Sequence, residues 1–210
     1  MSKKIFTDYF KNNTWQGKES VSGPGSDYEQ TKYLIPELDI LLKELNIKTM
    51  LDAPCGDFNW MRNVNLDNIK YIGGDIVEPL IERNNRRHRS KNISFSVIDI
   101  TKDSLPRVDL ILVRDCFVHL DHNDIIKALN NIKNSESKYL LTTNFFWQSF
   151  KNNKDIKVGD WRRINFIQPP YNFKYPDKII IEGNIQSNDR DKTLGLWQIK
   201  DLPDFRVKNG

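Results

Sequence analysis

The sequence predicts an α/β fold, in which a mainly parallel sheet of seven strands has helices on both faces. Three observations carry this prediction. Five short apolar runs alternate with helical patterns, two more apolar runs follow towards the end, and an acidic residue ends or adjoins four of the first five runs. Alternation of this kind favours right-handed crossovers and parallel strands. The parallel strands are predicted at residues 48–52, 71–75, 94–99, 108–115 and 138–144.

Helical patterns precede and separate these strands. Apolar residues at spacings of three and four predict a first helix that ends near Asn46, and Ser26 with Glu29 fit a capping box at its start. Further helices are expected at residues 58–64, 77–87 and 121–133, the last with Asp121 as its N-cap. The runs "KIIIEG" (178–183) and "TLGLWQI" (193–199) are expected to pair as antiparallel strands.

Length and composition indicate one soluble domain. We expect 210 residues to form a single domain with an N-terminal segment and helix at 1–46, a cofactor-binding core at 47–144, an acceptor-side lid at 145–178 and C-terminal strands at 179–210. No apolar run approaches the roughly 20 residues that span a bilayer. The absence of a secretory signal pattern and the presence of only two cysteines favour the reducing cytoplasm.

Four aspartates, Asp52, Asp75, Asp99 and Asp115, end or adjoin predicted parallel strands. Because the carboxyl ends of parallel strands share one edge of a sheet, these carboxylates should meet at a ligand-binding rim. Such a rim repels the phosphates of a dinucleotide. It suits a ligand rich in hydroxyl and amino groups, which donate hydrogen bonds to carboxylates.

The stretch "LDAPCGDFNWM", residues 51–61, carries the first of these acids. It reads as a strand, a tight turn at Cys55 and Gly56, and a helix whose N-terminus faces the ligand. Gly56 permits close approach of the backbone, and Pro54 stiffens the turn. The sequence therefore places a ligand-binding loop directly after the first strand.

Three stretches, "LDAPCGDFNWM", "YIGGDIV" and "LVRDCFVHL", carry a resemblance to the class I S-adenosylmethionine-dependent methyltransferases, which covers roughly residues 20–145. The resemblance implies a Rossmann-like fold, S-adenosylmethionine as cofactor and S-adenosylhomocysteine as product. The same stretches resemble a bacterial subfamily found mostly among uncharacterised or surface-carbohydrate genes. One departure is that only Gly56 remains of the three glycines usual in the first loop.

Residue roles follow from this resemblance. The first loop would cradle the methionine part of the cofactor, Asp75 would hold the ribose, Asp99 would meet the adenine, and Arg114 would face the methyl group. Trp60 either stacks near the cofactor or belongs to the core. The implied cofactor residues are Asp52, Ala53, Pro54, Gly56, Asp57, Trp60, Asp75, Ile76, Asp99, Ile100 and Arg114.

Methyl transfer to a hydroxyl needs a proton acceptor, because the cofactor activates only the methyl group. His119 and Asp115 are the candidate catalytic residues. The alternatives are a structural histidine at a loop-helix junction and an aspartate that caps a helix or pairs with Arg114. A set of metal ligands is imitated by Asp115, His119 and Asp121, but their spacing is not diagnostic and no metal is expected.

Two segments outside the strands are candidate covers for the site. "SGPGS", residues 22–26, offers backbone amides for the cofactor carboxylate or is a plain connector. The 145–178 segment is expected to close over the acceptor, with Trp161, Arg162 and Arg163 as substrate-binding residues; surface ion pairing is the alternative. "QPPY", 168–171, resembles an element of amino-group methyltransferases, but it follows the fifth strand and not the fourth.

The function that these observations favour is O-methylation of a small molecule or sugar. The subfamily resemblance points to bacterial capsule or surface glycans, including phosphoramidate-type substituents. A nucleic-acid methyltransferase, a nucleotide-binding dehydrogenase and a non-catalytic cofactor-binding protein remain as alternatives. The net charge of +4 is a mild bias, and the basic run at 83–92 has no interleaved aromatics for base stacking. The acceptor and the oligomeric state do not follow from the sequence.

Overall fold

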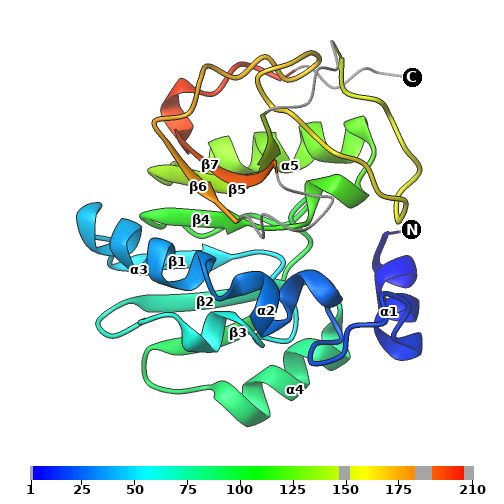
Figure 1. The fold of residues 1–210 in the computed structure, drawn as a ribbon, viewed down its shortest axis with the longest axis vertical. Helices are drawn as coiled ribbons and strands as arrows, with labels where there is room; N and C mark the ends of the chain where they lie inside the picture. The colour runs from blue at the N-terminus through cyan, green and yellow to red at the C-terminus, as the bar shows by residue number, and fades with distance from the viewer. Residues whose placement is uncertain (1, 147–151, 183–190, 206–210) are drawn as a thin grey trace.

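The computed structural model describes residues 2–146, 152–182 and 191–205, and its centre is one seven-stranded sheet (Figure 1). The strands lie in the order β3-β2-β1-β4-β5-β7-β6. In Figure 1 they are stacked from β3 at the bottom to β6 and β7 at the top. Their bounds are β1 Thr49–Asp52, β2 Lys70–Asp75, β3 Ile93–Val97, β4 Leu110–Val113, β5 Tyr139–Phe145, β6 Lys178–Ile181 and β7 Lys192–Gln198.

The sheet is mixed, because one strand runs against the others. β3, β2, β1, β4 and β5 pair in parallel, whereas β7 pairs antiparallel with both β5 and β6. The prediction of a parallel core with a terminal antiparallel pair is confirmed, but the sheet is not parallel throughout. The insertion of β7 between β5 and β6 brings its first residue, Lys192, to the edge where the parallel strands end.

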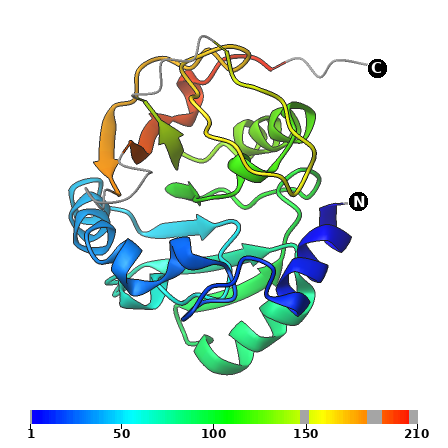
Figure 2. The same cartoon turned by 45° about the vertical axis from the view of Figure 1, so that its right-hand side comes forward.

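Helices cover both faces of the sheet, and the N-terminal segment lies at the carboxyl ends of the parallel strands. Figure 1 and its rotated view in Figure 2 both show α1 at the end of the strands, beside the loop of residues 152–177. The longer helices are α1 Ser2–Asn12, α3 Leu34–Glu44, α4 Glu78–His88 and α5 His122–Asn134. The short ones are η1 Pro24–Ser26, α2 Tyr28–Thr31, η2 Met61–Asn63, η3 Phe117–His119 and η4 Ile199–Asp201.

Two apolar cores lie on the two faces of the sheet. One joins α3 and residues 58–66 to Met50, Leu110 and Leu112. The other joins α5 and residues 164–173 to Leu51 and Ile111. Alternating strand residues therefore serve opposite cores, as the period of two in a strand requires. No helix within the described ranges is long and apolar enough to cross a membrane.

The helix after β4 begins as predicted. Asp121 is the N-cap of α5, and its carboxylate accepts a hydrogen bond from the Asp124 N–H at 2.7 Å. The capping box at Ser26 and Glu29 is wrong, because Ser26 lies within η1 and Asp27 occupies the N-cap position of α2. The Tyr28 N–H at the start of α2 donates to the Glu19 carboxylate, so a side chain from outside the helix satisfies it.

The predicted helix at 58–64 is also wrong. Only the single turn of η2 forms there, and Phe58 has a φ of 61°. The Asn59 N–H donates to the side chain of Asp57, and such a local bond competes with helix formation. The side chains of Phe58, Trp60 and Met61 are all buried in this irregular backbone.

Candidate functional site

A cavity of about 360 Å³ opens at the carboxyl edge of the sheet. It is lined by residues that end or follow β1, β2, β3 and β4, by the end of β5 and by the start of β7. Asp52, Asp75, Asp99 and Asp115 all line it, so the prediction that these four aspartates meet at one rim is confirmed. The size falls within the range of small-molecule sites.

The loop after β1 forms one wall, and hydrogen bonds fix its backbone. The Cys55 N–H donates to the Gly74 carbonyl at 2.8 Å, and the Asn84 amide of α4 donates to the Gly56 carbonyl at 2.7 Å. Gly56 has a φ of 53°, which favours glycine, and a Cβ there would lie 2.3 Å from Ser22 Oγ. The close approach that Gly56 permits is therefore to the N-terminal segment.

Two buried carboxylates stand at the ends of β1 and β2. Asp75 accepts from the Gly56 N–H at 3.1 Å and the Val77 N–H at 3.0 Å, and Asp52 accepts from the Tyr71 hydroxyl at 2.7 Å. Burial raises the pKa of Asp75 to about 6 against these N–H groups, and it raises the pKa of Asp52 to about 7 against Tyr71. Both side chains are costly to ionise here without a further hydrogen-bond donor.

Asp99, after β3, has contacts of two kinds. It lines the cavity, and it also holds a turn by accepting from the Thr101 hydroxyl at 2.6 Å and the Thr101 N–H at 3.0 Å. Burial acts to raise the pKa of Asp99, but Thr101 and Lys102 outweigh it and lower the pKa. Ile76 and Ile100 line the same part of the cavity and make it apolar.

The other wall carries a network of opposite charges. Arg114 Nε and Nη2 donate to Glu182 Oε2 at 3.0 and 2.6 Å, and Nη2 also donates to the Gly25 carbonyl. Lys192 Nζ lies 2.6 Å from Asp115 and 3.2 Å from Glu182. Burial would raise the pKa of Asp115, but Lys192 and Arg114 hold it well below its usual range. Asp115 is therefore an ionised and weakly basic carboxylate.

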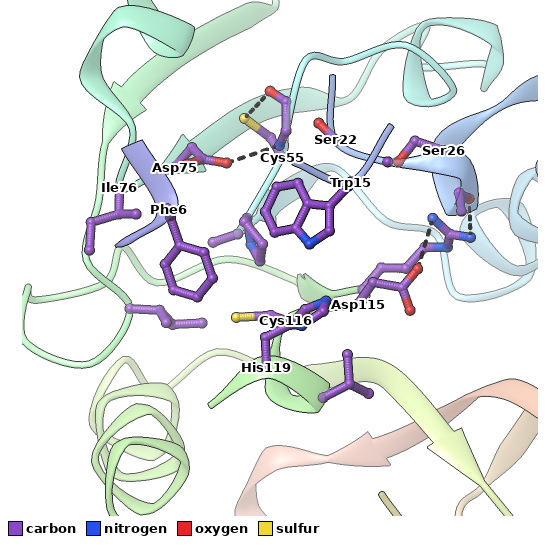
Figure 3. A pocket seen from close by; sticks show the side chains of 18 of the residues that line it. Phe6, Trp15, Ser22, Ser26, Cys55, Asp75, Ile76, Asp115, Cys116 and His119 are labelled. Carbon is purple, nitrogen blue, oxygen red and sulfur yellow. Dashed lines mark hydrogen bonds and ion pairs between the residues drawn. The ribbon is translucent and has the colours of Figure 1, made fainter. Parts of the chain in front are cut away.

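His119 lines the cavity from η3, close to Asp115 (Figure 3). Its Nδ1 lies 2.9 Å from the Asp160 carbonyl oxygen. Because a carbonyl only accepts, this contact assigns the proton to Nδ1 and leaves Nε2 with a free lone pair. Burial lowers the pKa of His119, although the Asp160 carbonyl and Asp115 oppose the shift. A neutral imidazole is the form that can accept a proton.

Residues 2–26, the N-terminal segment, cover one side of the cavity and are called the roof below. Asp57 holds it by accepting from the Ser20 hydroxyl at 2.8 Å and the Val21 N–H at 3.0 Å, while its own N–H donates to Ser22 Oγ. Asp57 is absent from the cavity lining, so the structure gives it an anchoring position beside the site. Residues 22–26, predicted as a possible cover, do line the cavity.

The 152–177 segment approaches the same cavity from the β5 side. The Gly159 N–H donates to the His119 carbonyl and the Arg162 N–H to the Val118 carbonyl, which fixes the segment against η3. Trp161 lines the cavity and is half exposed. Residues 147–151, which belong to the lid predicted at 145–178, lie outside the described residues.

The two arginines predicted to bind substrate do not line the cavity. Arg162 is buried and donates to the Phe117 carbonyl at 2.9 Å. Arg163 pairs with Asp191 and lies over the rings of Phe145 and Trp161. Both guanidinium groups are engaged in holding the segment. The "QPPY" stretch is likewise absent from the lining.

Most of the predicted site residues line the cavity. Trp60 is buried and also lines the cavity, with the Arg114 guanidinium 5.1 Å from its ring centroid. No group of three or more His, Cys, Asp or Glu side chains in the described part of the chain is arranged to hold a metal ion. The predicted residues that line the cavity are Asp52, Ala53, Pro54, Gly56, Trp60, Asp75, Ile76, Asp99, Ile100, Arg114, Asp115, His119 and Trp161.

Sequence reasoning missed the aromatic residues of the roof and the cation from β7. Phe6, Phe10 and Trp15 line the cavity, as does Lys192. In Figure 3, Phe6 and Trp15 lie between the side that carries Asp75 and the side that carries His119. Ile5, Phe6, Tyr9 and Phe10 follow the spacing of an amphipathic helix, and that pattern was the available signal.

Comparison with known proteins supplies the fold family but not a relative. No family model matches the sequence, and no curated protein matches it. Among solved structures, the methyltransferase domain of a bacterial CtHen1 aligns with a TM-score of 0.59 and 16% identity, over 80% of this chain and 99% of that one.

Two further methyltransferase structures agree. Phosphoethanolamine N-methyltransferase 1 of Haemonchus contortus, in complex with phosphoethanolamine and S-adenosylhomocysteine, aligns with a TM-score of 0.59 and 16% identity over 94% of this chain, which spans 50% of that one. Magnesium protoporphyrin IX methyltransferase of Synechocystis PCC 6803, with S-adenosylhomocysteine bound, aligns with a TM-score of 0.54 and 11% identity, over 75% of this chain and 84% of that one. The chain therefore has the Rossmann-like fold of these methyltransferases. Identities this low show the fold alone.

Proposed function

We propose that this chain is an S-adenosylmethionine-dependent methyltransferase that acts on a hydroxyl group. The observation that carries the proposal is the cavity at the carboxyl edge, in which the acids at or just after the ends of β1, β2 and β3 share one lining with a neutral histidine after β4. The similar fold of solved methyltransferases, two of them with S-adenosylhomocysteine bound, supports the choice of cofactor.

The proposed cofactor pose follows the chemistry of the walls. The ribose hydroxyls donate to Asp75, whose raised pKa reflects a buried carboxylate in need of donors. The adenine lies between the apolar side chains of Ile76 and Ile100, near Asp99. The methionine part lies along the loop from Ala53 to Gly56, beneath the roof of residues 22–26. This pose directs the methyl group towards η3.

The chain's part in the reaction is then to orient the acceptor and to take its proton. S-adenosylmethionine, when bound, supplies the activated methyl group. His119 Nε2 accepts the hydroxyl proton, while the Asp160 carbonyl holds the imidazole in the tautomer that leaves Nε2 free. Asp115, kept ionised by Lys192, orients the acceptor and stabilises the imidazolium that forms.

The acceptor in this proposal is a small molecule or a sugar, including the phosphoramidate-type substituents of bacterial surface glycans. The glycan context rests on the sequence resemblance. The structure adds an aromatic rim, because Trp161 is half exposed at the cavity and Phe145 packs against it edge-on, with 6.2 Å between the ring centroids. An exposed and restrained indole suits a ring-shaped acceptor.

Calorimetric titration with S-adenosylmethionine, S-adenosylhomocysteine and NAD tests the proposed cofactor directly. We expect both S-adenosyl compounds to bind and NAD to give no response, because buried acids at the rim repel its pyrophosphate. Clear binding of NAD, with none of the S-adenosyl compounds, would contradict the proposal and favour a dehydrogenase.

The role of His119 can be separated from that of the nearby His122. His122 bonds the Tyr171 hydroxyl and lies outside the cavity lining, so His122→Ala is the matched control. We expect His119→Ala to lower kcat by about 100-fold or more while S-adenosylhomocysteine still binds. Methyl incorporation is measured with labelled cofactor and a panel of hydroxylated acceptors. Full turnover by His119→Ala would remove this residue as the base.

A further inference from the structure

We propose that Trp15 detects the positive charge of the bound cofactor, so that the pocket distinguishes S-adenosylmethionine from the neutral product. This inference rests on the proposed function and adds a residue from the roof to the cofactor site. A sulfonium ion is attracted to the face of an indole, which gives the strongest cation–π interactions among protein side chains.

The position of Trp15 carries the inference. Its ring centroid lies 5.8 Å from that of His119, and both side chains line the cavity. The proposed cofactor has its ribose at Asp75 and its methyl group near His119, so its sulfonium lies between these two residues. Figure 3 shows the indole of Trp15 in that interval. The sulfonium therefore passes within reach of the indole.

The roof holds this indole from several sides. Trp15 packs edge-on against Tyr9, with 5.3 Å between centroids, and stacks with Phe6 at 6.3 Å. A Cβ at Gly23 would lie 3.0 Å from Trp15 Cβ, so the turn at Gly23 is closely packed on the same residue. Restraint before binding reduces the entropy that the interaction costs.

The polar contacts that attach α1 to the rest of the protein are weak. Lys3 pairs with Glu78 at 3.2 Å, and both side chains are more than half exposed. Ser2 donates to Asp124 at 3.3 Å, and the Tyr9 hydroxyl donates to the Gly159 carbonyl at 3.4 Å. Exposed pairs and long hydrogen bonds of this kind stabilise little. A bound cation adds an attachment that the neutral product lacks.

Paired titrations of each variant with S-adenosylmethionine and S-adenosylhomocysteine test the inference. We expect Trp15→Leu to weaken S-adenosylmethionine binding by about 2- to 30-fold more than it weakens S-adenosylhomocysteine binding. Trp15→Phe, which keeps a smaller aromatic face, should fall between wild type and Trp15→Leu. A non-reactive analogue with an ammonium group in place of the methylated sulfur should follow S-adenosylmethionine.

Tyr33→Leu is the control, because Tyr33 is an exposed aromatic residue outside the cavity lining. It should leave the ratio of the two affinities unchanged. Equal losses for the two ligands in Trp15→Leu, or no loss for either, would overturn the inference while leaving the proposed function intact. A wild-type protein that binds neither ligand would overturn both.

Discussion

The two walls of the cavity handle buried charge in opposite ways. On the β1 to β2 side, Asp52 and Asp75 receive hydrogen bonds from hydroxyl and N–H groups, and their pKa values are raised to about 7 and about 6. On the β4 to β7 side, two cations, Arg114 and Lys192, pair with two carboxylates, Asp115 and Glu182, so the protein itself neutralises the network. In the proposed function a ligand completes the first wall, whereas the charges of the second wall are already paired within the protein.

Because of this difference, we expect one wall to affect mainly ligand affinity and the other mainly the stability of the fold. A carboxylate whose pKa is raised by burial gains most from a ligand that donates hydrogen bonds to it. A paired buried charge contributes to the fold only while its partner remains. Substitutions on the two sides of the cavity should therefore have their largest effects on different measurements.

The largest effect is expected from Arg114→Met. Glu182 and Arg114 are both buried, so removing the arginine leaves the Glu182 carboxylate with Lys192, 3.2 Å away, as its remaining cation, and should lower the free energy of unfolding by up to about 3 to 5 kcal/mol. Urea denaturation measures this loss. Lys178→Met, which breaks an exposed pair with Glu44, should lower it by less than about 1 kcal/mol.

A double variant sharpens the result. Arg114→Met combined with Glu182→Met replaces both buried charges by apolar side chains, which is often close to neutral. It should therefore regain much of the lost stability. If the single variant is no less stable than Lys178→Met, the β4 to β7 wall does not depend on internal pairing, and the contrast between the walls fails.

The next effect is on cofactor affinity through the other wall. Asp75→Asn removes the charge that should accept hydrogen bonds from the ribose, and S-adenosylhomocysteine binding should weaken by about 1 to 3 kcal/mol in calorimetric titration. Asp67→Asn changes an exposed acid away from the cavity and serves as the control. An unchanged affinity in Asp75→Asn would show that this carboxylate does not hold the cofactor.

A smaller effect is expected from pH. The pKa of Asp75 in the empty protein is raised to about 6, and the proposed ligand favours its ionised form. Affinity for S-adenosylhomocysteine should therefore be complete above about pH 7 and be lost as pH falls through 6, by about tenfold at pH 5. Titrations of wild type and Asp75→Asn across this range would show the slope only in wild type; parallel curves would contradict the assignment.

The sequence predicted the strands because their signal is local and their environment uniform. Met50, Leu51, Ile111 and Leu112 are wholly buried, and short apolar runs between helical patterns have few other interpretations. The rim of aspartates followed from topology, because parallel strands place their ends at one edge. These features depend on periodicity and chain order, both of which a sequence contains.

The features that were missed depend on tertiary partners. The sequence suggests that Asp57 binds the cofactor from the first loop. Only the folded chain shows that its carboxylate accepts hydrogen bonds from Ser20 and Val21. In the sequence Arg162 is a candidate to bind an anion, but in the structure its guanidinium donates a hydrogen bond to the Phe117 carbonyl. The α1 helix was missed because its apolar face covers a cavity, so its aromatic residues are half-buried and its other residues are mostly polar and exposed.

The meeting of Gly25 with Lys192 has a consequence for how the protein is made. A Cβ at Gly25 would lie 3.2 Å from Asp115 and 3.8 Å from Lys192, so the cavity joins residues that are far apart in the sequence. A nascent chain leaving the ribosome has β1 to β5 long before it has β7. Until residue 192 emerges, Arg114 and Asp115 lack their partners Glu182 and Lys192, so this wall of the cavity forms only after β7 has been synthesised.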